Sequence, residues 1–105
     1  MLTDEDVDTA IAAVAIGCDA HPLMGAMERR VILKHAPFAA KRLRELVNCG
    51  AITGDTLIDD AVAMVGFGWL FMAIWRPSIR WMVQLILDAY FYELEQDNSR
   101  ASPVV

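Results

Sequence analysis

Four side chains of the types that bind metals are present: Cys18, His21, His35 and Cys49. A structural zinc site takes its ligands in closely spaced pairs. Cys18 and His21 have that spacing, but thirteen residues separate His35 from Cys49. We therefore expect no metal site and no cofactor, and instead two free thiols and two histidines at helix ends. Free thiols are typical of the cytoplasm, and the acidic start MLTDEDVD lacks the positive charge of a secretory signal.

The sequence offers little material for nucleophilic catalysis. It contains no GxSxG, HExxH, GxxxxGK[ST] or GxGxxG motif. Ser78 lies at an expected helix start, and Ser99 and Ser102 lie near the C-terminus. The paired acids Asp59 and Asp60 open another expected helix, where the helix dipole accounts for them. The sequence therefore predicts a protein that is not an enzyme.

A band of positive charge lies between residues 29 and 44, a span without any acid. The members of this basic band are Arg29, Arg30, Lys34, Lys41, Arg42 and Arg44. The whole chain has a net charge of −5, whereas nucleic-acid binders typically show a basic face or a high isoelectric point. We therefore expect the band to contact an acidic protein partner, or acidic patches of the chain or of a second copy. A DNA-binding regulator that uses residues 29–44 as a helix-turn-helix is a less favoured alternative.

Turn residues divide the chain into five expected helices, and no run alternates apolar and polar residues as a strand would. The expected helices cover residues 3–19, 22–35, 37–49, 53–75 and 78–96. Thr3 is a good N-cap, Pro37 suits a first helical turn, and Gly50 stands where a left-handed residue ends a helix. We expect an all-α fold, a compact bundle of about five helices in one domain (residues 1–97), followed by a flexible C-terminal tail (residues 98–105).

Apolar residues recur at helical spacing on one side of four of these helices, and we expect the four faces to form the core. On the first helix they are Val7, Ala10, Ile11, Val14 and Cys18; on the second, Leu23, Met24, Met27, Val31 and Ile32; on the third, Phe38, Leu43, Leu46 and Val47. On the last helix they are Ile79, Met82, Val83, Ile86, Leu87, Tyr90, Phe91 and Leu94, with Arg80, Gln84 and Asp88 on the opposite side.

The stretch AVAMVGFGWLFMAIW, residues 61–75, contains no charged or polar side chain. Such a helix is about 22 Å long, whereas a bilayer core of roughly 30 Å needs about twenty residues. We therefore expect a central helix buried on all sides, in which Gly66 and Gly68 let another backbone pack closely. The alternative is a membrane-embedded or membrane-lying protein of the inner membrane, holin-like or a complex subunit, that uses residues 61–92. The sequence Trp75-Arg76-Pro77 resembles small phage holins in these three positions.

The chain holds more apolar side chains than a monomer of this size usually buries: 56% of the residues, beside 22% charged residues. This surplus predicts a further buried surface, and we expect homo-oligomers that associate through Trp75, Trp81, Leu85 and Tyr92. The favoured hypothesis is a small, non-enzymatic, cytoplasmic interaction protein, such as an inhibitor, adaptor or assembly subunit, that acts by protein–protein binding. Proteins of this class are common in phage and mobile elements.

Overall fold

Four α-helices build the protein in the computed structural model, which describes residues 1–101 and the side chains of residues 1–98. The helices are α1 (Asp4–Ala20), α2 (Ala26–Asn48), α3 (Ile58–Val65) and α4 (Trp69–Ala101). No strand occurs among these residues, so the all-α class is confirmed, and four helices stand where about five were expected. Of the expected tail, residues 98–101 continue α4, and residues 102–105 lie outside the described residues.

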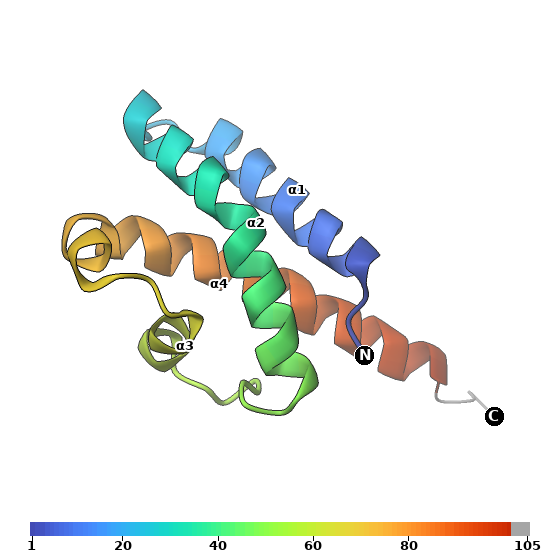
Figure 1. The fold of residues 1–105 in the computed structure, drawn as a ribbon. Coiled ribbons are helices and arrows are strands. Elements are labelled where there is room, and N and C mark those ends of the chain that lie inside the picture. Colours follow the sequence, from blue (N-terminus) through green and yellow to red (C-terminus); the bar gives the residue numbers. More distant parts are fainter. Residues whose placement is uncertain (102–105) are drawn as a thin grey trace.

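The longest helix, α4, sets the dimensions of the molecule. Its 33 residues correspond to about 50 Å of helix, and the longest extent of the molecule is 51 Å. Figure 1 shows α4 running the whole length of the molecule, with α2 crossing its middle, α1 on one side of it and α3 on the other side beside its first half. All three other helices pack against α4. The central helix is therefore α4, and its two ends extend beyond the bundle.

The first helix forms as its sequence predicts. The Thr3 hydroxyl accepts a hydrogen bond from the Asp6 backbone N–H, and the Asp6 carboxylate accepts one from the Thr3 N–H at 2.7 Å. This reciprocal capping box satisfies two backbone donors that a helix start leaves without partners. Val7 and Val14 are buried, together with Ala10 and Cys18, so the expected core face of α1 is confirmed.

The second and third expected helices are one helix, α2, which continues through Pro37. A proline inside a helix removes one backbone hydrogen bond and costs about 3 kcal/mol. Its buried positions follow helical spacing on both sides of the proline: Ile32, Ala36, Ala39, Ala40, Leu43 and Leu46. We attribute the continuity to this one face, because a break at Pro37 would take half of it out of the core.

The apolar positions expected for the second helix are wrong at Leu23 and Met27, which are exposed. Ile32 is buried as expected, and Met24 packs against the core. The reason for the difference is that residues 22–25 precede the helix. Helix α2 begins at Ala26, and its buried face begins at Ile32. On the later half Leu43 and Leu46 are buried as expected, whereas Phe38 is exposed.

The apolar run of residues 61–75 is divided between two helices, so the expected central apolar helix is wrong. Gly66 has a φ of 89° and ends α3 in the left-handed region, which glycine enters without strain. The chain then turns, and α4 begins at Trp69. A Cβ atom added at Gly66 or Gly68 would meet no atom within 4 Å, so the expected close backbone contact is also wrong.

Helix α4 bends near Pro77, as expected. Trp75 has non-helical torsion angles, φ −115° and ψ 15°, where the proline ring crowds the preceding turn. Beyond the bend the expected core face is confirmed: Ile79, Met82, Val83, Ile86, Leu87 and Tyr90 are buried. Arg80, Gln84 and Asp88 are exposed, as their spacing predicts.

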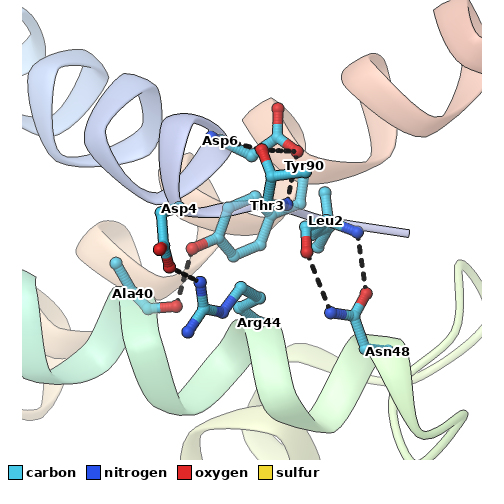
Figure 2. Close-up of polar contacts among 8 residues, drawn as sticks. All are labelled: Leu2, Thr3, Asp4, Asp6, Ala40, Arg44, Asn48 and Tyr90. Atoms are coloured by element: carbon cyan, nitrogen blue, oxygen red, sulfur yellow. Dashed lines mark hydrogen bonds and ion pairs between the residues drawn. The ribbon is translucent and has the colours of Figure 1, made fainter.

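Polar contacts fasten the N-terminal segment to α2, and α2 to α4. The Asn48 side chain forms two hydrogen bonds with the Leu2 backbone, and Arg44 forms an ion pair with Asp4 (Figure 2). Next to these contacts, the buried Tyr90 hydroxyl donates a 2.6 Å hydrogen bond to the Ala40 carbonyl. These contacts connect residues 40 to 50 positions apart, so they fix α1, α2 and α4 together at one end of the bundle.

Candidate interaction surface

The basic band divides into two groups of three residues. The first group forms ion pairs, Arg29 with Asp19 at 2.6 Å, Arg42 with Glu45 at 3.5 Å, and Arg44 with Asp4. Two of these pairs join α2 to α1, and the hydrogen bond that Arg44 donates to the Asp4 carboxylate raises the pKa of the Arg44 guanidinium. Part of the band therefore neutralises acids of the same chain.

The second group, Arg30, Lys34 and Lys41, lies on the outer side of α2. All three are exposed, and the described part of the chain provides no ion-pair partner for them. Their spacing of four and seven residues puts them in one row along the helix. This row is accordingly a positively charged stripe that faces solvent in a single copy.

Two of the residues expected to mediate self-association pack within the chain. Trp81 and Leu85 are half-buried and lie against Gly17 of α1, where a Cβ atom would sit 2.8 Å from Leu85 Cδ1 and 3.2 Å from the Trp81 ring. The indole of Trp81 also meets the His21 ring edge-on, with ring centroids 5.9 Å apart. Gly17 therefore lets α4 approach α1 closely.

The other two expected residues differ in their surroundings. Trp75 is half-buried at the bend of α4 and packs against the core. Tyr92 lies two residues beyond Tyr90, the last buried position of α4, and its side chain is exposed. Of the four residues, Tyr92 is the one that a single copy leaves largely uncovered.

Sequence reasoning missed the most exposed apolar surface of the described residues. It covers the first turns of α4, where Trp69 is 81%, Leu70 58% and Ile74 62% exposed. Ala73 and Pro77 are exposed on the same side, because positions 69, 70, 73, 74 and 77 share one helical face. We name these five residues the α4 apolar face. The signal that could have located them is Gly66, which separates the segment from α3.

Aromatic side chains hold the opposite side of this segment against α2. The rings of Phe71 and His35 lie 4.5 Å apart, and Phe67 contacts both Phe71 and Phe38. Ring contacts of this kind add stability beyond the area they bury. The α4 apolar face therefore lies on a helical segment that packs against α2.

Charge is distributed unevenly along α4. Between residues 69 and 87 the charged residues are Arg76 and Arg80, and between 88 and 98 they are four acids: Asp88, Glu93, Glu95 and Asp97. Arg80 forms an ion pair with Asp59 of α3 at 2.7 Å, whereas Arg76 has no ion-pair partner among the described residues. The helix thus has a basic, apolar first half and an acidic second half.

The candidate metal ligands do not come together. Cys18 is buried at the end of α1, where desolvation raises the pKa of its thiol, and Cys49 is exposed at the end of α2. No group of three or more His, Cys, Asp or Glu side chains within the described residues could hold a metal ion. Nor does any described helix combine the length and apolar character needed to cross a bilayer.

No known protein family, curated protein or solved structure matches this chain. Functional inference therefore rests on the surface of the molecule itself. Its most distinctive features are the α4 apolar face and the division of charge along the same helix.

Proposed function

We propose that this protein is a small, non-enzymatic interaction protein that acts by protein–protein binding and associates with a second copy of itself through α4. The single observation that carries the proposal is the exposure of Trp69, Leu70 and Ile74 on one face of a packed helix. A large exposed apolar patch of this kind is typical of a binding surface. Covering it removes apolar area from water, which favours association.

The charges along α4 indicate a second copy as the occupant. In an antiparallel pair of α4 helices, the basic first half of each copy lies beside the acidic second half of the other. A twofold axis at the level of Met82 brings Arg76 to the level of Asp88 of the other copy in both directions, because an isologous interface repeats each contact. The dimer then contains two pairs of opposite charges in addition to its apolar contact.

The same register matches apolar groups. Tyr92 of the second copy comes to the level of residues 70–74, beside Leu70 and Ile74. Positions 70, 74, 77, 84, 88 and 92 are exposed at steps of three, four or seven residues, so they form one continuous stripe along α4. Residues 69–92 span about 36 Å of helix, which is long enough for an extended contact.

The middle of this stripe is concave. Pro77, Arg80, Trp81 and Gln84 of α4 surround a hollow of about 330 Å³ that Ile58 completes from α3. Trp81, one of the expected association residues, thus lines the concave centre of the stripe even though much of it packs on α1. A side chain of the second copy fits in this hollow and would bury more of the indole.

Replacing Ile74 with glutamate tests the proposal. The α4 apolar face then carries a charge that association would have to desolvate, so Ile74→Glu is expected to convert the assembly to monomers. Light scattering after size-exclusion chromatography, in buffer without detergent, measures the mass. The matched control is Ile16→Glu on α1, because Ile16 is 68% exposed and lies on another helix. Ile16→Glu should keep the mass of the unchanged protein.

Other outcomes would refute the proposal. A mass of one chain for the unchanged protein, together with Ile74-dependent binding to vesicles of anionic lipid, would assign the α4 apolar face to a membrane surface. Duplex DNA binding that disappears when Arg30, Lys34 and Lys41 are replaced would assign the function to the basic band instead. Equal masses for both glutamate variants and the unchanged protein would show that the face does not mediate association.

A further inference from the structure

A second hollow lies on the other side of Pro77, between the α1–α2 turn, the first turns of α2 and the bend of α4. Its volume is about 290 Å³. Met24, Ile32, Pro77 and Trp81 give it apolar walls. Pro77, beside the bend of α4, is part of its lining, and the dimensions suit a small organic group.

One carboxylate faces this apolar space. Glu28 Oε2 accepts a 2.9 Å hydrogen bond from the Ser78 hydroxyl, which is itself more than nine-tenths buried. Among the described residues no cation forms an ion pair with Glu28, because the neighbouring Arg29 pairs with Asp19. Glu28 lines the hollow and is only partly buried, so its carboxylate is open to a ligand there.

We infer that this hollow binds an organic ammonium or guanidinium cation with an apolar body. The cationic group would donate a charge-assisted hydrogen bond to Glu28, and such bonds are about twice as strong as neutral ones. The apolar body would pack against Met24, Ile32 and Pro77. The indole of Trp81 offers a face for a cation–π contact at the same place.

The surrounding contacts hold these groups in place before a ligand arrives. Ser78 fixes Glu28 from α4, and Glu28 stands in the first turn of α2. His21 Nδ1 accepts a 3.3 Å hydrogen bond from the Leu23 N–H, and the His21 ring supports Trp81 edge-on. A preformed site of this kind loses less entropy when it binds its ligand.

Two kinds of molecule carry such a cation. One is a free amine, and the other is a protein with an exposed lysine or arginine side chain. Two probes distinguish them: n-butylammonium and Nα-acetyl-lysine amide, with n-butanol as the neutral analogue of the first. Tighter binding of the lysine probe assigns the site to a protein side chain, and tighter binding of butylammonium assigns it to a free amine. Pro77 and Trp81 also belong to the proposed association surface, but Ile74 does not line this site, so the Ile74→Glu variant should still bind the probes.

The test follows the Trp81 indole N–H and the Met24 methyl group by NMR during titration of the full chain. Butylammonium is expected to bind roughly tenfold more tightly than butanol, and Glu28→Gln should remove that difference. The control Glu5→Gln removes an exposed acid of α1 and should leave the preference unchanged.

Equal affinity for butylammonium and butanol in the unchanged protein would overturn the inference, as would titrations that leave both signals unmoved. The comparison of the two probes needs no variant, so it remains decisive even if Glu28→Gln fails to fold. A preference for the cation that survives in a folded Glu28→Gln protein would also overturn it.

Discussion

At the scale of single residues, Tyr90 forms a buried hydrogen bond that joins two helices. Its side chain is buried on α4, and its hydroxyl donates to the Ala40 carbonyl on α2 across fifty positions of sequence (Figure 2). Its burial on α4 follows from helical spacing. The Ala40 carbonyl as its partner does not, because that contact exists only once α2 runs through Pro37 beside α4.

Removing the Tyr90 hydroxyl should destabilise the protein. Tyr90→Phe leaves the ring in the core but loses a buried hydrogen bond, which lowers the free energy of unfolding by about 1 kcal/mol. Urea denaturation followed by circular dichroism measures the change. Tyr92→Phe is the control, because Tyr92 is exposed and should change stability by less than about 0.5 kcal/mol. Equal losses in both variants would speak against the Tyr90–Ala40 contact.

Alkaline titration examines the same residue in another way. Desolvation raises the pKa of the Tyr90 phenol above its ordinary value of about 10. The unfolded chain therefore releases this proton first, so the stabilisation is complete below about pH 10 and declines as the pH rises further. The free energy of unfolding should fall by up to about 1.4 kcal/mol per pH unit from this group. A Tyr90→Phe protein with the same slope above pH 10 would contradict this origin.

Local residues could be predicted from sequence where one helix decides their role. Thr3 caps α1, and Gly50 takes a positive φ of 82°, as their positions predict. Gly17 could not be predicted, because its role depends on Leu85 and Trp81 arriving from another helix. The exposure of Trp69 could not be predicted for a similar reason. An apolar residue in a long apolar run is expected to be buried, and the exposure of Trp69 depends on where α3 ends.

At the scale of helices, the difference between expectation and structure comes from proline and glycine. Pro37 and Pro77 were each expected to bound a helix. Pro37 lies inside α2, because the continuous buried face of α2 outweighs one lost hydrogen bond, whereas α4 bends beside Pro77, where Trp75 has non-helical torsion angles. Gly66 ends a helix inside a run with no polar residue. Gly66 itself is the signal for that end, because no polar residue of the run marks a turn.

The two glycines of this turn provide a matched pair. Gly66→Ala should lower the free energy of unfolding by about 1 kcal/mol, because an L-residue is strained at a φ of 89°. Gly68→Ala has open space and no positive φ, so stability should stay the same or rise as the unfolded chain loses freedom. Thermal unfolding of both proteins measures the difference. Similar stabilities would contradict the left-handed end of α3.

At the scale of the whole molecule, one long helix organises both the fold and the proposed association. Its middle packs against α1, α2 and α3, while its first turns expose Trp69 and Ile74 and its second half carries the acids. The expectation of a further burial surface came from composition and stays a prediction. Composition could not locate that surface, because the position of the apolar face depends on where α3 ends.

The central claim, an antiparallel pair of α4 helices, is tested most directly by exchanging the two charges that it places together. Arg76→Glu and Asp88→Arg each put like charges opposite one another, so each should weaken the dimer roughly tenfold. The double variant restores opposite charges with their positions exchanged, and sedimentation equilibrium should show the dimer regained. Monomers at all concentrations for the unchanged protein, or a double variant that associates no better than either single variant, would contradict the claim.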